Sequence, residues 1–246
     1  MAKTFNIGTN KQGLIVYGGE ASRDYGMVIS EAPAFEKPSR KQTIYTVPGR
    51  NGAVLFQQDA WDDVTRSYKV WLDDSQTDLA RKVADFSAWL NSQKGYIRLE
   101  DNFEPDVYRL AYYPGGDEFS NELTQYGEAT LNFICRPERF YKDAEQPVEV
   151  SDGDKLYNPT RFTSKPLIYI EGSGTITVTI GGNTISATVS DYIYIDCETM
   201  SAYRLATENK NSLISGDFPQ IPAGSNTVGI TGTTTKVTIT PRYFTI

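Results

Sequence analysis

Histidine is entirely missing from this chain of 246 residues. Its absence excludes every mechanism built on imidazole, including Ser-His-Asp triads, Cys-His dyads, HExxH zinc sites and haem held by histidine. Cysteine is nearly missing as well. Cys135 and Cys197 lie far apart and form no CxxC spacing, so we expect neither a zinc site nor a disulfide framework. Two small buried thiols in a reducing compartment are the expectation instead.

Long apolar runs and an excess of positive charge are absent too. No stretch of 18 apolar residues occurs, so we expect no membrane insertion. The first residues carry no apolar segment of the kind that directs secretion, and we expect no Sec-type signal. The formal net charge is −7. A general nucleic-acid binder is therefore disfavoured, because phosphate backbones are bound by basic surfaces.

The composition that remains is that of a folded protein. Hydrophobic residues make up 39% of the chain and charged residues 22%, which excludes a typical disordered chain. The length suits one large domain or two of ordinary size, and it allows a core that needs no disulfide or metal.

The first half reads as strands around a single helix. From Asp78 to Leu90, apolar residues recur with a period of 3.6, which predicts a helix that lies on a sheet. Residues 30–41 carry two prolines and no periodicity, which predicts a long loop. The predicted strands of this half are Leu14–Tyr17, Met27–Ile29, Gln42–Thr46, Ala53–Phe56, Ser67–Leu72, Tyr96–Leu99, Val107–Tyr113 and Glu128–Cys135.

The second half changes in composition and shows no helix. The acidic stretch Lys142–Asp154 reads as a linker or a crossover, and it places a boundary between domains 1–145, with a helix near 78–92, and 146–246. Seven or eight short strands in the second domain indicate a β-sandwich or jelly roll. They are Pro166–Gly172, Gly174–Ile180, Thr184–Val189, Tyr192–Cys197, Ala202–Ala206, Asn226–Ile230 and Lys236–Phe244. The fold class is therefore mainly β.

Candidate catalytic and ligand-binding motifs are weak. Adjacent carboxylates such as Glu100-Asp101 point to opposite faces of a strand, and the acids near Glu104 are interpreted as solvated turn residues. The run 151–154 lacks the closing glutamate of a calcium loop. Gly172-Ser173-Gly174 precedes no helix and is interpreted as a hairpin turn rather than a phosphate loop. We expect no catalytic, metal or cofactor-binding residue and no enzyme activity.

One segment favours contact with another protein chain. Pro48-Gly49 suits a type II turn, and Asn51-Gly52 suits a second tight turn, with Arg50 exposed between them. A decorated hairpin loop is the plainer interpretation. The other interpretation is a contact loop made of Pro48, Gly49, Arg50, Asn51 and Gly52.

Four features in order along the chain resemble the distal tail proteins of long-tailed bacteriophages, the Dit or siphovirus-type tail components. The first two are the Pro-Gly-Arg-x-Gly turn within Val47–Leu55 and a β-rich first half with one helix at Asp78–Leu90. The third is the run Asn158–Ile168. The fourth is Asp191–Cys197 followed by Gly216–Asn226, where Phe-Pro and Pro-Ala-Gly-x-Asn turn into a final strand.

The resemblance implies a structural protein of a phage or prophage tail. Six copies of the N-terminal domain would close into a ring at the distal end of the tail tube, and the C-terminal domain would be a galectin-like β-sandwich. The expected partners are other copies of the chain, the tail tube protein, the tail-tip protein and receptor-binding baseplate proteins. DNA would pass through the lumen only as cargo. The expected location is the virion tail, after assembly in the bacterial cytoplasm.

Three alternatives stay open. A carbohydrate-binding module would show exposed coplanar aromatic side chains on the second domain. A tail tube subunit would polymerise into long stacks instead of stopping at one or two rings. A glycosidase would need a converging carboxylate pair.

Overall fold

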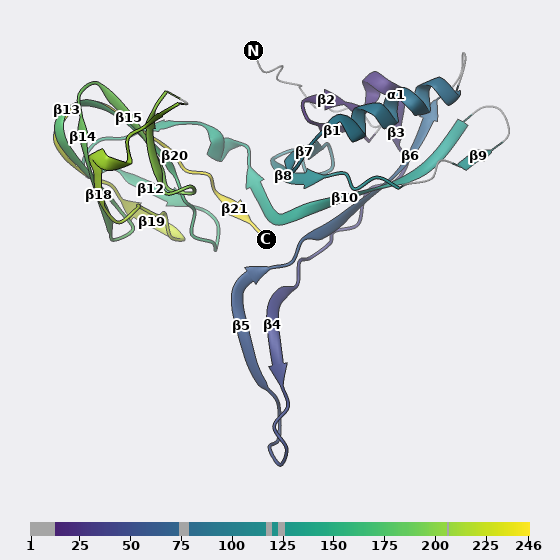
Figure 1. Cartoon of the computed structure of the whole chain (residues 1–246), viewed down its shortest axis with the longest axis horizontal. Coiled ribbons are helices and arrows are strands. Elements are labelled where there is room, and N and C mark those ends of the chain that lie inside the picture. The colour runs from purple at the N-terminus through teal and green to yellow at the C-terminus, as the bar shows by residue number, and fades with distance from the viewer. Residues whose placement is uncertain (1–12, 74–78, 117–119, 123–125, 206) are drawn as a thin grey trace. The chain divides into compact units, whose positions relative to one another are not determined.

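The computed structural model describes residues 13–73, 79–116, 120–122, 126–205 and 207–246 (Figure 1). The chain divides into two compact units. The first ends at Arg139 and also contains Ile246, and the second covers Phe140–Thr245. The predicted division into domains 1–145 and 146–246 stays a prediction. The expectation of a mainly β fold is confirmed.

The first unit is built on one antiparallel sheet with the strand order β2-β1-β7-β8-β10-β6-β3, and β9 also pairs with β10. A separate two-stranded sheet, β4-β5, extends from it (Figure 1). The strands are β1 Ile15–Tyr17, β2 Glu20–Ala21, β3 Met27–Ile29, β4 Arg40–Tyr45, β5 Val54–Trp61, β6 Val64–Asp73, β7 Ile97–Asp101, β8 Val107–Tyr112, β9 Ser120–Glu122 and β10 Tyr126–Tyr141.

The helix of this unit is α1, Leu79–Ser92, and a short 3-10 helix spans Ser22–Tyr25. Phe86, Trp89 and Leu90 of α1 are buried in the same apolar core as residues of β1, β6 and β10. The period of 3.6 therefore predicted the buried face of α1 correctly in the part that the structure describes. The predicted first residue, Asp78, lies outside the described residues.

The second unit is a curled sheet around its own core, with the strand order β11-β20-β13-β15-β16-β17 and with β14 on β13 and β18 on β14. Strands β12 and β19 form a separate pair. The elements are β11 Val148–Glu149, β12 Lys155–Asn158, β13 Leu167–Ile180, β14 Asn183–Val189, β15 Tyr192–Asp196, β16 Ser201–Arg204, β17 Glu208–Asn209, β18 Ile214–Gly216, β19 Gly224–Thr227, β20 Gly229–Thr240 and β21 Phe244–Thr245, with 3-10 helices at Asp143–Glu145 and Asn211–Leu213.

The long strand β13 bends and exchanges one partner for another, while β20 stays paired with it on both sides of the bend. Before Gly172, β13 pairs with β15, and from Gly174 onward it pairs with β14. The pairing of β13 with β20 shifts register between Glu171 and Gly172. A Cβ on Gly172 would lie 2.4 Å from the carbonyl oxygen of Thr233, so glycine lets the two backbones approach. The predicted hairpin turn at residues 172–174 is therefore wrong, because these residues form a bend inside one strand.

Two further expectations have clear outcomes. The predicted linker Lys142–Asp154 belongs to the second unit, where Ala144 and Val150 are buried in the core and β11 pairs with β20, so the linker interpretation is wrong.

Both cysteines are buried and unpaired, as expected, and burial raises the pKa of each thiol to about 12. Over the described residues, no helix is long and apolar enough to cross a membrane.

Candidate assembly hairpin

The predicted contact loop lies at the tip of the hairpin formed by β4 and β5. The backbone N–H of Arg50 donates to the carbonyl of Val47 at 3.2 Å, and Gly49 has a φ of 79°. This is the type II turn that Pro48-Gly49 predicts, since its third position requires a positive φ. Gly52 has a φ of 80° and turns the chain again. All five residues from Pro48 to Gly52 are exposed.

Exposure extends far beyond the tip. Every residue from 41 to 59 is exposed, although the sequence of both strands is rich in apolar side chains. Ile44 is 59% exposed, Leu55 49% and Phe56 62%. Contiguous apolar surface of this kind marks a site of interaction with another molecule.

The strand register sorts these side chains onto two faces. Ile44 pairs with Leu55, and Tyr45 pairs with Val54. Directly opposed residues of an antiparallel pair share a face, and neighbours along a strand alternate. One face therefore carries Ile44 and Leu55, and the other carries Tyr45 and Val54 together with Phe56. An isolated two-stranded hairpin is marginally stable in water, so apolar residues on both faces favour a hairpin that is covered from both sides in an assembly.

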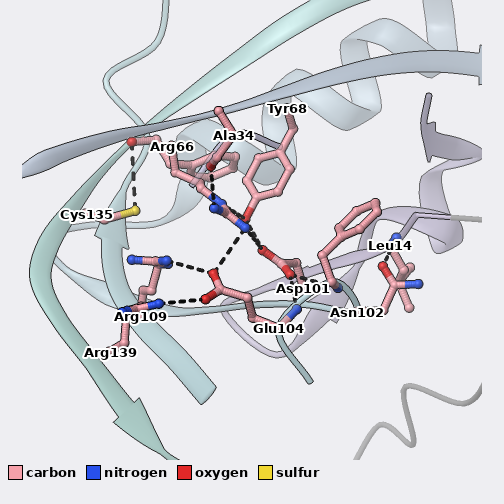
Figure 2. Close-up of polar contacts among 12 residues, drawn as sticks. Leu14, Ala34, Arg66, Tyr68, Asp101, Asn102, Glu104, Arg109, Cys135 and Arg139 are labelled. Carbon is pink, nitrogen blue, oxygen red and sulfur yellow. Dashed lines mark hydrogen bonds and ion pairs between the residues drawn. The ribbon is translucent and has the colours of Figure 1, made fainter. Parts of the chain in front are cut away.

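The root of the hairpin is fixed by Arg66, which lies on β6 just after the hairpin. Its side chain is only 2% exposed, and its Nη1 donates to the carbonyl of Ala34 at 2.8 Å (Figure 2). Ala34 belongs to residues 30–39, the irregular segment that leads into β4. At the same root, the guanidinium of Arg40 lies 4.6 Å from the ring centre of Trp61. Arg66 thus ties the entry of the hairpin to the strand that follows its exit.

Two carboxylates balance the buried Arg66 (Figure 2). The Oδ2 of Asp101 accepts from Arg66 Nη2 at 3.0 Å and from the Tyr68 hydroxyl at 2.7 Å. Its Oδ1 accepts the backbone N–H groups of Phe103 and Glu104, both at 2.9 Å. This carboxylate therefore joins β6 to the turn after β7 with all its polar atoms satisfied.

Glu104 extends the network to two more strands. Its carboxylate accepts from Arg109 Nη2 at 2.7 Å and from Arg139 Nη1 at 3.0 Å, and it lies 3.2 Å from Arg66 Nη2. Burial alone would raise the pKa of Glu104, but the hydrogen bonds and charges of Arg109 and its neighbours outweigh it, so this pKa lies below its usual range.

The sequence-based interpretation of Glu104 was wrong. Glu104 is not a solvated turn acid, because it forms ion pairs with Arg66, Arg109 and Arg139. Asp101 lies on a strand as expected, but it is only 5% exposed and pairs with Arg66. Their cationic partners Arg66, Arg109 and Arg139 come from three different strands, so no spacing along the sequence indicates them. The exposure of the hairpin was also missed, although the apolar residues on both sides of Pro48–Gly52 were a usable signal.

The described part of the chain offers no cluster of metal ligands beside the hairpin. Within those ranges, no three cysteine, aspartate or glutamate side chains gather in a way that could hold a metal ion. The arginines and acids of the network pair with each other.

Comparison with known proteins connects this geometry to phage tails. Residues 25–135, which contain the hairpin and most of the network, match the family model of the phage tail protein RIFT-related domain. No curated protein sequence matches the chain significantly.

Among solved structures, the chain is similar to Dit (gp 19.1) of phage SPP1, which its title describes as a paradigm of the hub adsorption apparatus in phages that infect Gram-positive bacteria. The match has a TM-score of 0.75 and 14% sequence identity, and it covers 95% of this chain and 99% of the SPP1 protein. At this identity the match shows a shared fold. The family model and the shared fold support the resemblance to siphovirus tail proteins of the Dit type that the sequence shows.

Proposed function

We propose that six copies of this chain close into a ring at the distal end of the tail tube, where the ring serves as the hub for assembly of the baseplate or tail tip. The first unit is the ring-forming domain, and the second is a galectin-like domain available to further partners. The partners are the tail tube protein, the tail-tip protein and receptor-binding baseplate proteins. In this proposal the protein is not an enzyme, it assembles in the bacterial cytoplasm, and DNA only passes through the lumen.

The observation that carries the proposal is the hairpin with apolar residues exposed on both faces. Cyclic rings form through head-to-tail contacts, in which one surface of each copy meets a different surface of the next. A projecting hairpin suits such a contact because it extends away from the main sheet of the first unit (Figure 1). Full burial of one large aliphatic or aromatic side chain contributes about 1.5–3 kcal/mol, so a few hairpin residues supply much of the affinity of a subunit contact.

The proposed contact residues at the tip have a supporting role. Pro48 and Gly49 fix the turn, and Arg50 is the charged group at the end of the hairpin. In the ring, we expect these residues to reach the neighbouring copy along with the apolar residues behind them. The alternative function is that of a tail tube subunit. Such a subunit would polymerise into long stacks, whereas a distal hub protein would stop at one or two rings.

The test is size-exclusion chromatography with light scattering, applied to the full chain at several concentrations with and without its tail tube protein. The wild type is expected to form a species of about six times the 27.5 kDa chain mass. The variants Leu55→Asp and Phe56→Asp each place a charge on one face of the hairpin and are expected to remain monomeric. Tyr157→Asp, on an exposed residue of β12, is the matched control.

Two results would contradict the proposal. A wild-type protein that stays monomeric at every concentration and beside the tube protein would eliminate the ring. Hexamers that form equally well in both hairpin variants would eliminate the hairpin as the contact. Unchanged tryptophan emission of the variants establishes that the first unit is folded, because Trp61, Trp71 and Trp89 all lie in it.

A further inference from the structure

The tip of the β4–β5 hairpin holds the single Asn-Gly pair of the sequence, Asn51-Gly52. Asparagine is a chemically labile residue, and its side-chain amide can be attacked by the main-chain nitrogen of the next residue. Glycine at that next position has no Cβ to obstruct the attack. The φ of Gly52 is 80°, and a Cβ built there would meet nothing within 4 Å, so the space beside the reacting nitrogen is open.

The two groups that would react are not held by other residues. Over the part of the chain that the structure describes, neither the Asn51 side chain nor the N–H of Gly52 has a hydrogen-bond partner. The ladder of the hairpin ends at the pair of Tyr45 and Val54, before it reaches them. Asn51 and Gly52 are both exposed, so water and hydroxide reach them.

The single Asp-Gly pair of the sequence, Asp152-Gly153, lies in the opposite environment although its chemistry is the same. The φ of Gly153 is 87°, close to that of Gly52. However, the N–H of Gly153 donates to the carbonyl of Val228 at 2.8 Å, and Oδ1 of Asp152 accepts the N–H of Ile230 at 2.8 Å. These bonds fix both reacting groups, so we expect this pair to be protected and Asn51-Gly52 to be reactive.

We propose that Asn51 is a site of spontaneous deamidation in the free chain, and that the modification removes the chain from ring assembly. The nitrogen of Gly52 gives its proton to hydroxide and forms a bond to Cγ of Asn51. The bond from Cγ to Nδ2 breaks, and Nδ2 takes a proton from water and leaves as ammonia. Water then opens the cyclic imide. Cleavage of the bond from nitrogen to Cγ gives aspartate, and cleavage of the bond from nitrogen to the main-chain carbonyl carbon gives isoaspartate.

The modification changes the charge and the main chain of the hairpin tip. Arg50 is the single charged residue between positions 42 and 58, so that span has a formal charge of +1, which the new carboxylate brings to zero. Isoaspartate also adds a methylene group to the main chain between the two tight turns.

The effect on assembly rests on the proposed function, in which the tip reaches the next copy. A carboxylate next to Arg50 competes for its guanidinium with acceptors on the neighbouring copy, and charge at an interface governs which surfaces associate. In the ring, the neighbouring copy covers the tip and limits access of water. Deamidation and assembly therefore compete for the same free chain.

The first test is peptide mapping by mass spectrometry of the full-length protein after incubation at mildly alkaline pH, with enzymatic methylation to detect isoaspartate. Asn51 is expected to convert faster than Asn209, an exposed asparagine that precedes lysine. Its rate should rise with pH, because the attacking nitrogen must lose its proton, and Asp152 should yield no isoaspartate. Asn51→Gln should lose the signal at this position, because its longer side chain has to close a larger ring.

The second test is size-exclusion chromatography with light scattering beside the tail tube protein. Asn51→Asp carries the aspartate product and should give a smaller fraction of hexamer, whereas the neutral control Asn51→Gln should assemble as the wild type does. Asn51 should also convert more slowly in isolated wild-type hexamers than in the variant Phe56→Asp, which is expected to remain monomeric.

The possible failures can be told apart. Conversion of Asn51 that is no faster than that of Asn209 would overturn the modification site. Equal hexamer fractions of Asn51→Asp and Asn51→Gln, in conditions where the wild type forms hexamers, would overturn the effect on assembly. A wild type that never forms hexamers would contradict the proposed function and the effect on assembly with it, while the comparison of Asn51 with Asn209 would still decide whether the site is modified.

Discussion

Replacement of Asp101 by asparagine tests the ion network beneath the hairpin. The side-chain oxygen of asparagine can still accept the N–H groups of Phe103 and Glu104, so the turn after β7 is preserved. The other position becomes an amide nitrogen that faces Arg66 Nη2, which lies 3.0 Å from the present oxygen. Two donors then oppose each other in a buried site, and Arg66 loses one of its two counter-charges.

The expected loss of stability is about 3 kcal/mol, the lower end of the range of about 3–5 kcal/mol for removing one partner of a buried ion pair. The lower end applies because Glu104 remains 3.2 Å from Arg66. With a urea dependence of about 2 kcal/mol per molar, the unfolding midpoint of the first unit should fall by about 1.5 M. Tryptophan fluorescence follows this unit selectively, because the second unit contains no tryptophan.

The matched control is Glu31→Gln, which removes one carboxylate from the ion pair with Lys69 at the surface of the same unit. Exposed pairs contribute about 0–1 kcal/mol, so this midpoint should hardly change. Equal, small shifts of the urea midpoint in Asp101→Asn and Glu31→Gln would refute the reasoning, since they would show that the buried ion pair stabilises the first unit no more than the exposed pair does.

Three more predictions concern the bend, a buried acid and an ion pair. Gly232→Ala should destabilise the second unit by about 1–3 kcal/mol, because the φ of Gly232 is 108° and a Cβ there would lie 2.5 Å from the carbonyl oxygen of Thr175. Urea unfolding followed by circular dichroism measures this loss. Gly229→Ala, where the nearest atom to the added Cβ is 3.5 Å away, should change the stability little, and equal losses in the two variants would contradict this account of the bend. Burial raises the pKa of Glu36, so the ionised carboxylate destabilises the first unit at neutral pH. Glu36→Gln should therefore raise the urea unfolding midpoint of the first unit at pH 7 and leave it unchanged at pH 3, where the carboxyl is protonated in both the folded and the unfolded state. A lower midpoint of the variant at pH 7 would contradict this prediction. Burial opposes ionisation of Asp196, but the hydrogen bonds and charge of Arg242 outweigh it and lower its pKa; its stabilisation is present above about pH 4 and lost as the pH falls below that value, so Asp196→Asn should flatten the acid loss of stability of the second unit.

Local patterns predicted the elements of this chain well where the pattern itself has a physical cause. The period of 3.6 gave the buried face of α1, and the Pro48-Gly49 pair gave a type II turn with the expected positive φ. Both depend on residues that are neighbours along the chain. The resemblance to phage distal tail proteins rested on the order of such local motifs and is confirmed.

Features that depend on contacts between residues far apart along the chain could not be predicted from the sequence. Gly172 resembled a turn residue, and only its pairing with Thr233 and Thr234 of β20 shows that it lies in a bend within β13. The sequence showed Asp101 as one acid of an adjacent pair on a strand, and only the fold shows that Arg66 and Tyr68 of β6 and the turn after β7 surround it. The apolar run Ala53–Phe56 indicated a strand but could not show that both of its faces stay uncovered, because that depends on the rest of the fold.

The central claim is that the hairpin joins copies of the chain into a ring. The most direct measurement is an electron cryomicroscopy map of the full-length protein mixed with its tail tube protein. The account predicts a ring with sixfold symmetry in which residues 42–57 of each copy lie against the next copy, with Phe56 and Leu55 both buried. A ring whose hairpins project freely into solvent, or a mixture without any ring, would contradict it.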